Sequence, residues 1–251
     1  MMRTTSTRRL GAAAAALGAA LLVSLAFGAG AANASTTTST LTPDQVAALQ
    51  AKMDTYGVPA AQQDGLIAKI EAGQPLDADT GAAPVSTSTV TIGYENETVE
   101  RYADGSFAAT STPVDLDQAK TIAASQSAGH IVPLASGNAT GCSYSYGAGV
   151  AVYDNCLVKR STVALTMWFR VNYHVASSST EIEALGSWDM YATGAACQET
   201  SFKITHKQAT TSPATARLTG NCTVVGNLGT STPYLEFRVT SGGSESWTSN
   251  F

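Results

Sequence analysis

The chain has 251 residues and a formal net charge of −5 at neutral pH, from 14 basic and 19 acidic side chains. This length holds one or two domains of ordinary size. The acidic balance disfavours nucleic acid and anionic membranes as partners, because both attract basic surfaces.

Residues 1–34 have the features of a secretory signal peptide. Three arginines within residues 3–9 precede an apolar run over residues 10–28, and Ala32-Asn33-Ala34 fits the small-x-small cleavage pattern. The alternative is a membrane anchor, but the run is near the lower length limit for a spanning helix and the cleavage pattern follows it directly. Removing the three arginines of the leader, which holds no acids, leaves 11 basic and 19 acidic residues and a net charge of −8.

We therefore expect a secreted, extracellular protein in which residues 35–40 form a flexible polar tether. No later stretch is apolar and long enough to span a bilayer, so no stable membrane anchor is expected.

The segment of residues 41–129 is predicted to form a small α/β module. In "LTPDQVAALQAKMDTYG", Thr42 is placed to cap a helix, Pro43 suits its first turn and Gln45 completes a capping box. A second helix fits residues 60–72, and a glycine ends each helix. Neither helix is long enough to be stable alone, so the pair must pack on other elements.

The stretch "STVTIGYENETVERYADGSFAATS" predicts a β-meander after a short linker. Asp104-Gly105 is a favourable hairpin turn, and an earlier turn is expected near Glu95-Asn96. The residues expected to face inward are the large apolar ones, Val90, Ile92, Val99, Tyr102 and Phe107. Another helix is expected within residues 115–129, followed by a connector over residues 130–141.

Residues 142–251 are predicted to form an antiparallel β-sandwich. The stretch "TVALTMWFRVNYHV" alternates without a break, with apolar side chains at the odd positions from Val163 to Val175. This period of two is typical of a strand with one buried face. "FKITHK", "ATARLTGNCTVV" and "YLEFRVT" repeat it between turns rich in Gly, Ser, Thr and Pro. The fold class expected is mainly β, with a C-terminal antiparallel sandwich stapled by disulfides and a small α/β module before it.

Residues 162–175 and 181–192 are expected to pair as a hairpin across "ASSST". Only a register that pairs odd with even positions keeps both apolar sets on one face. The chosen register has these opposite pairs: Phe169 with Trp188, Met167 with Met190, His174 with Glu183, and Trp168 with Asp189.

All four cysteines lie after the leader, at Cys142, Cys156, Cys197 and Cys222. An even number of cysteines in an exported protein implies disulfides. A metal site or a redox site would show close pairs such as C-x-x-C, whereas the spacings here are 14, 41 and 25 positions.

The stretch "GCSYSYGAGVAVYDNC" is expected to be a hairpin stapled by Cys142 and Cys156. A straight strand of that length would hold its ends ~45 Å apart, whereas disulfides need Cα atoms within about 7 Å. The chain must then fold back near Ala148-Gly149-Val150, where glycines permit a turn. Cys197 and Cys222 pair by elimination, although their strand phases differ and a bulge after Cys197 is needed. Sequence alone allows three connectivities.

Three segments, "LIAKIEAGQPLDADTGAAPVS", "TVERYADGS" and "GCSYS…YDNC", together resemble secreted proteins of high-GC Gram-positive bacteria that have no assigned function. The resemblance covers most of the mature chain, and Cys197 and Cys222 depart from it. It implies secretion, and it implies no activity, substrate or catalytic residue.

We expect no enzyme active site, no cofactor and no metal site. Neither G-x-S-x-G nor H-E-x-x-H occurs in the sequence. The three histidines, His130, His174 and His206, are isolated along the chain, as structural histidines usually are. Alternating acids such as Glu181 and Glu183 are typical of a solvated strand face rather than of a glycosidase pair.

One predicted strand face carries groups that binding surfaces use. Trp168, Arg170, Asn172 and His174 share this face and offer an aromatic ring, a forked cation, an amide and an imidazole. The alternative is that a second layer covers Trp168 and that neighbouring acids neutralise Arg170. These four residues form the candidate ligand-binding site.

The function expected is that of a secreted, non-enzymatic binding protein whose extracellular ligand is a protein or a glycan. One alternative is a secreted hydrolase without a sequence motif, which a deep pocket holding His174 or His130 beside a carboxylate would favour. Another is a membrane-active β toxin, because alternating strands rich in Ser and Thr can form pores. A third makes the N-terminal module a pro-segment.

Overall fold

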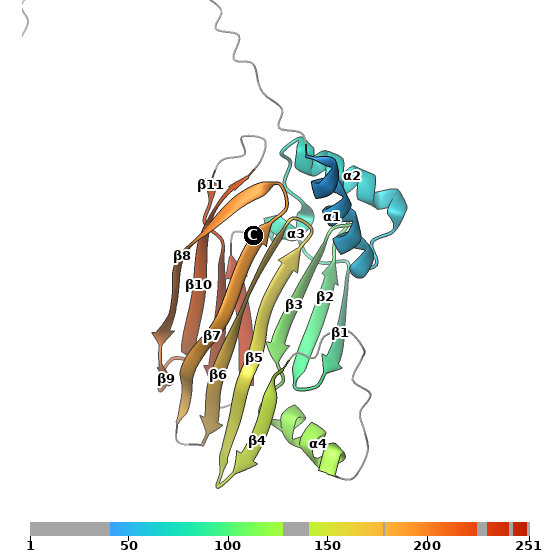
Figure 1. Ribbon diagram of the computed structural model, residues 1–251. Coiled ribbons are helices and arrows are strands. Elements are labelled where there is room, and N and C mark those ends of the chain that lie inside the picture. Colours follow the sequence, from blue (N-terminus) through green and yellow to red (C-terminus); the bar gives the residue numbers. More distant parts are fainter. Residues whose placement is uncertain (1–40, 128–140, 178, 225–229, 241–242, 250–251) are drawn as a thin grey trace, which may run out of the picture. The chain divides into compact units, whose positions relative to one another are not determined.

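Strands form most of the chain that the computed structural model describes, and they build two antiparallel sheets (Figure 1). The mainly β fold confirms the fold class expected from the sequence. The expected signal peptide, tether and connector up to residue 140 lie outside the described residues. These are residues 41–127, 141–177, 179–224, 230–240 and 243–249, all within one compact unit, residues 37–251.

The described helices are α1 (Pro43–Thr55), α2 (Ala60–Glu71), α3 (Asp77–Thr80) and α4 (Leu116–Ser127). The described strands are β1 (Ser86–Ile92), β2 (Glu95–Arg101), β3 (Phe107–Pro113), β4 (Ser143–Gly147), β5 (Val150–Thr162), β6 (Leu165–Ala176), β7 (Thr180–Ala192), β8 (Ala195–His206), β9 (Gln208–Ala209), β10 (Ala214–Val224), β11 (Thr230–Ser231), β12 (Tyr234–Thr240) and β13 (Gly243–Ser249). Within the described ranges, no helix combines the length and the apolar character needed to cross a membrane.

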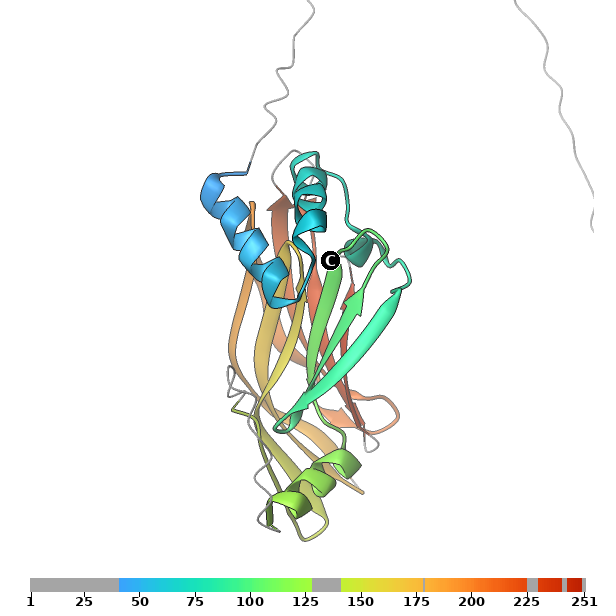
Figure 2. The same ribbon diagram turned by 90° about the vertical axis from the view of Figure 1, so that its right-hand side faces the viewer.

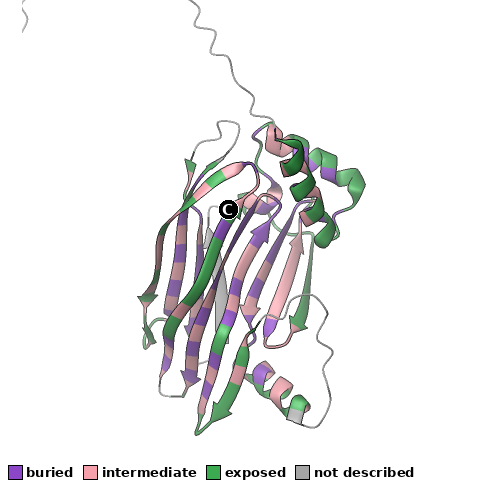
Figure 3. Ribbon diagram, in the orientation of Figure 1, coloured by how far each residue is buried: buried purple, intermediate pink, exposed green. Residues whose placement is uncertain are grey.

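The two sheets pack against each other around a shared core. The large sheet has the order β1-β2-β3-β5-β6-β7-β9, with β4 paired to β5, and the small sheet has the order β11-β10-β12-β13, with β8 paired to β10. Rings from both sheets meet in the core: the centroids of Tyr173 and Phe237 lie 5.2 Å apart, and those of Phe169 and Phe202 lie 5.3 Å apart. Figure 3 shows buried residues alternating with more exposed ones along the central strands.

β6 supplies the centre of this core because its side chains alternate as the sequence predicts. All six odd positions from Leu165 to Val175 are buried, whereas the even positions from Trp168 to His174 are only partly buried. The register with β7 is confirmed at three predicted pairs, Met167 with Met190, Phe169 with Trp188, and Trp168 with Asp189.

The predicted pairing of His174 with Glu183 is wrong, because β7 contains two extra residues. The ladder shifts by one position twice between Phe169 and Tyr173, so that His174 lies opposite Glu181. Two single shifts restore the original parity, which keeps the apolar sets of both strands on one face. Glu183 nevertheless reaches His174, and its Oε1 lies 2.8 Å from Nδ1 of the imidazole.

The three N-terminal strands extend the large sheet instead of forming a module of their own. β3 pairs antiparallel with β5, with Ala109 opposite Ser161. This corrects the separation expected between residues 41–129 and residues 142–251. The physical reason is that pairing between strands far apart in sequence depends on tertiary contacts, which local residue patterns do not encode.

α1 and α2 cover one end of the large sheet on the face turned away from the small sheet (Figure 2). They pack on Phe107 and Ala109 of β3. Ala109 pairs with Ser161 of β5, and Ser161 lies on the opposite face of β5 from Val158, which belongs to the core between the sheets. The predicted capping box of α1 is present in both directions, between Thr42 and Gln45.

The β-meander differs from its prediction at the sheet edge. Val90, expected to face inward, is 57% exposed, because β1 is the end strand of the large sheet. Tyr102 and Phe107 are buried as expected. The first turn lies at Gly93-Tyr94 and not at Glu95-Asn96, since Ile92 already pairs with Glu95.

Both predicted disulfides are present. Cys142–Cys156 closes the β4–β5 hairpin, whose turn residues Ala148 and Gly149 have φ of 52° and 80°. Cys197 and Cys222 lie opposite each other on β8 and β10, and a register shift beside Gly220 supplies the required bulge. Two disulfides are typical of a protein that folds in an oxidising compartment.

Candidate functional site

The predicted binding stripe of Trp168, Arg170, Asn172 and His174 lies on the face of β6 that points away from the core. Two of its members form hydrogen bonds with the backbone at a bulge in β5. Arg170 donates from Nη1 to the carbonyl oxygen of Asn155 at 2.8 Å, and Asn172 Oδ1 accepts the Asn155 backbone N–H at 2.8 Å. Because the bulge takes Asn155 out of the strand ladder, these side chains satisfy its backbone groups.

The other two members of the stripe, His174 and Trp168, have different surroundings. Nδ1 of His174 lies 2.8 Å from Oε1 of Glu183. Trp168 takes no part in these bonds and lies partly exposed between Lys159 of β5 and Asp189 of β7. The structure therefore brings the four predicted residues onto one face, where Arg170 and Asn172 bond to the β5 backbone and His174 bonds to a neighbouring side chain.

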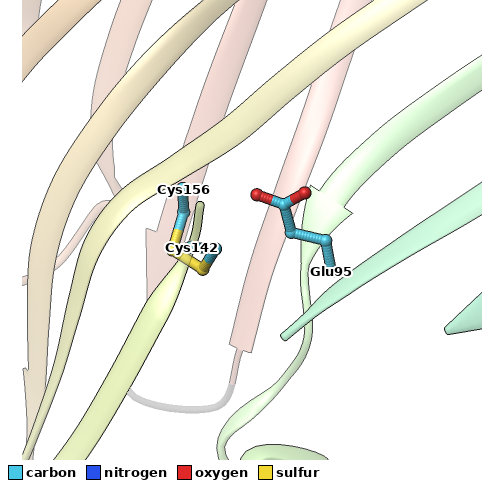
Figure 4. A group of neighbouring side chains, drawn as sticks. All are labelled: Glu95, Cys142 and Cys156. Atoms are coloured by element: carbon cyan, nitrogen blue, oxygen red, sulfur yellow. A yellow bond between two sulfur atoms is a disulfide. The ribbon is translucent and has the colours of Figure 1, made fainter. Parts of the chain in front are cut away.

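A carboxylate lies beside the first disulfide, as Figure 4 shows. One ligand atom of Glu95 and the sulfur atoms of Cys142 and Cys156 all lie within 4.8 Å of one another. Such a cluster would suit a metal ion only if both sulfurs were thiolates, and here they are bonded to each other. The hairpin is thus held by a covalent staple.

Glu95 has a structural part in this region. Its side chain is 2% exposed, and its Oε1 accepts the backbone N–H of Leu157 at 2.6 Å. The same oxygen lies 4.0 Å from Nη1 of Arg170. The carboxylate therefore ties β2 to β5 and β6 beside the disulfide.

A hydrolase would need a nucleophile beside a base, and one group of described residues has that chemistry. Lys52 of α1 donates to Thr166 Oγ1 at 2.8 Å, and this oxygen lies 2.7 Å from Ser161 Oγ. Burial, opposed by Asp79 and assisted by Lys159, lowers the pKa of the Lys52 amine to about 7. A hydroxyl beside a neutral amine is the arrangement of serine–lysine hydrolases.

The hydroxyl groups of this cluster are inaccessible to a substrate. Ser161 and Thr166 are only 3% and 2% exposed, because Lys52 and α1 lie over them. A carbonyl carbon cannot approach either oxygen without displacing α1. We interpret the cluster as a polar contact that docks α1 on the large sheet.

A pocket of about 490 Å³ lies at the end of the sandwich where β6 turns into β7. Its walls come from the β6–β7 turn, the β9–β10 loop and the end of β12. The lining residues are Ala176, Ser177, Ser179, Thr180, Ala209, Thr210, Thr211, Ser212, Pro213 and Thr240. Pockets of this volume are in the range that holds small organic ligands.

β9 creates this corner by crossing between the sheets (Figure 1). The chain leaves β8 of the small sheet, and Gln208 and Ala209 then pair with Glu181 and Thr180 of the large sheet. His206, at the end of β8, donates from Nδ1 to the carbonyl oxygen of Pro213 at 2.7 Å. This bond fixes both ends of the loop that forms one wall.

The lining is rich in hydroxyl groups and carries no charge. Seven of its ten side chains are those of serine or threonine, and the others are two alanines and a proline. Thr180 is 2% exposed, and its buried Oγ1 makes no hydrogen bond with the described residues. Glu181, next to Thr180 in sequence, is not part of the lining, and its Oε1 lies 2.6 Å from Lys207 Nζ.

Sequence reasoning missed this pocket. The signal was present as two short runs of small hydroxyl residues, "ASSST" and "ATTSP", but such runs are typical of any turn. Only the crossing of β9 brings the two runs together. A composition pattern alone could not have distinguished a pocket wall from a solvated loop.

Comparison with protein-family models, with curated proteins and with solved structures gave no match for this chain. A functional conclusion must therefore be argued from the geometry and chemistry of these sites.

Proposed function

We propose that this protein is an exported, non-enzymatic binding protein and that its pocket takes a small, neutral, hydroxyl-rich molecule such as a mono- or disaccharide. The observation that carries the proposal is the uncharged pocket of about 490 Å³, in which seven of the ten lining residues are serine or threonine. The leader sequence and the two disulfides support export, because disulfides persist in oxidising compartments.

The chemistry of the lining supports this ligand class. Serine and threonine hydroxyls both donate and accept hydrogen bonds, so they match the hydroxyl groups of a polyol in either direction. An uncharged lining gives a charged ligand no counter-ion, and desolvating such a ligand would be costly. Ala176, Ala209 and Pro213 offer apolar contact to C–H groups.

The exposed hydroxyls of the lining offer a site-directed test. Thr210, Thr211 and Ser212 of the β9–β10 loop are exposed, so a ligand in the pocket can reach them. Thr180 differs from them, because its Oγ1 atom is buried.

The non-enzymatic part of the proposal rests on the described histidines and hydroxyls. His174 and His206 are held by Glu183 and by the Pro213 carbonyl. The Lys52 amine donates to the buried Thr166 hydroxyl and to the Leu165 carbonyl oxygen. We expect no turnover of esters, peptides or glycosides.

The test is a titration of the protein with neutral mono- and disaccharides, in which NMR chemical shifts of the backbone amides report binding. We expect shifts confined to residues 176–180 and 209–212, and none with charged sugars. The double variant Thr211→Val/Ser212→Ala should weaken binding while leaving stability nearly unchanged, because it removes exposed hydroxyl groups of the lining. Thr223→Val, an exposed threonine at the other end of β10, is the matched control and should bind normally. Unchanged pocket amides with every sugar, or full binding by Thr211→Val/Ser212→Ala, would refute the proposal.

A further inference from the structure

β1 ends the large sheet with an unpaired edge. It pairs along all seven of its residues with β2, and no other described strand pairs with it. Six of the seven residues from Ser86 to Ile92 are exposed. Half of the backbone N–H and C=O groups of such a strand point away from the sheet, which makes it a template for another strand.

Among the described residues, β1 itself lacks the side chains that usually protect a sheet edge. Its sequence, "STSTVTI", holds no charged residue and no proline, and most of its residues are β-branched. The opposite side of the same sheet differs. There β7 carries Glu181, Glu183 and Asp189, and β9 covers its first residues. The contrast lies within one sheet, so it does not follow from overall composition.

Exposed apolar side chains mark the same edge. Val85 and Val90 are 67% and 57% exposed, the two largest values among the exposed large hydrophobic residues of the described chain. Val85 directly precedes β1, and Val90 lies within it. The two valines are five positions apart, ~17 Å along an extended chain, so Val90 is the exposed apolar side chain within the edge itself. An exposed apolar side chain on an uncharged edge strand favours coverage in an assembly.

We propose that β1 pairs antiparallel with β1 of a second copy of this chain, centred on Thr89, so that two large sheets become continuous across a two-fold axis. In an edge strand, every second residue points its N–H and C=O groups outward. Two copies can bond only through these outward residues, so the two-fold axis must pass at a residue and not between two residues. Thr89 is the midpoint of Ser86–Ile92, so this register uses the whole strand.

The strand is complementary to itself in this register. Ser88 of one copy lies opposite Val90 of the other, and Thr87 lies opposite Thr91. The two Val90 side chains then become diagonal neighbours on one face, where aliphatic side chains can reach each other. No like charges face each other across the pair, because the strand has none. This self-complementarity favours a second copy over an unrelated extended peptide.

The first test is the mass of the protein in solution, using the chain without residues 1–34 over a wide concentration range. We expect a dimer. Val90→Lys should yield a monomer of unchanged fold, since its side chain is exposed and β1 keeps its pairing with β2. Tyr146→Lys, at a 54% exposed position on β4, is the matched control and should remain dimeric.

The second test is cysteine cross-linking, which reports the register. Thr89→Cys should form a dimer linked by a disulfide, because the two positions face each other. Thr87→Cys should not form one, because position 87 faces position 91 of the partner, and the partner's own position 87 is four residues further along the strand. A monomer at every concentration, a dimer that persists in Val90→Lys, or cross-linking at position 87 rather than 89 would each overturn the proposal.

Discussion

Trp168 and Phe169 are neighbours in β6 but lie on opposite faces of the large sheet. Phe169 is fully buried, opposite Trp188 and against Phe202, whereas Trp168 is partly exposed opposite Asp189. The two rings are one residue apart in sequence and lie in different environments.

We expect alanine substitution to separate these two environments. Phe169→Ala should lower the free energy of unfolding by about 3–5 kcal/mol, because it leaves a cavity in the core. Trp168→Ala should leave folding nearly intact. Chemical denaturation of both variants measures this difference. A large loss of stability in Trp168→Ala would show that its face is covered, which would contradict the face assignment.

Removal of the Cys142–Cys156 disulfide should cost about 3 kcal/mol, the value expected for closing a loop of this size in the chain-entropy account. The double variant Cys142→Ala/Cys156→Ala removes it without leaving a free thiol. Cys197→Ala/Cys222→Ala is the matched comparison and should cost slightly more, since the sequence separation is 25 instead of 14. Equal stability of the wild type and both variants would contradict the role of the disulfides as staples. Peptide mapping without reduction checks the pairing.

Lys52 should make stability increase with pH above neutrality. Its pKa in the folded protein is about 7, below the ordinary 10.5, so between these values the unfolded chain binds more protons. The free energy of unfolding should therefore rise as pH increases from about 7 toward 9. Lys52→Met removes the titrating group and should flatten this rise, whereas Lys120→Met, at an exposed position on α4, should keep it. An identical slope in Lys52→Met would show that the amine is solvated.

Asp79 and Asp104 should have opposite effects on the acid side. Burial raises the pKa of Asp79 to about 6, so its contribution to stability is present below 3.8 and is lost as pH rises to about 6. Burial also acts on Asp104, but hydrogen bonds from Ser106 and Lys69 outweigh it and lower the pKa to about 2. Its contribution is present above 3.8 and is lost as pH falls toward 2.

The corresponding asparagine variants test this contrast. Relative to the wild type, Asp79→Asn should gain stability as pH rises from 3.8 to about 6, whereas Asp104→Asn should lose it as pH rises from about 2 to 3.8. Denaturation curves at several pH values give both differences. Shifts of the same sign in the two variants would contradict the assigned environments.

Local features of this protein could be predicted from its sequence because they depend on residues close together in the chain. The capping box of Thr42 and Gln45 joins groups three residues apart, and the turn at Ala148-Gly149 follows from the conformational freedom of glycine. The alternation of β6 has a period of two that any half-buried strand must show. The cysteine pairs followed from their number, their spacing and the glycine turn.

Tertiary structure decided what depends on contacts between distant segments. The pairing of β3 with β5 joins the N-terminal strands to the sandwich, and the bulges in β7 change the residue opposite His174 in the ladder from Glu183 to Glu181. Three members of the predicted binding stripe satisfy a strand bulge and a neighbouring carboxylate, which alternation alone could not reveal. The pocket exists only because β9 crosses between the sheets and brings two hydroxyl-rich turns together. Such features arise from the packing of whole elements, whereas a sequence pattern reports only the environment that each element would prefer by itself.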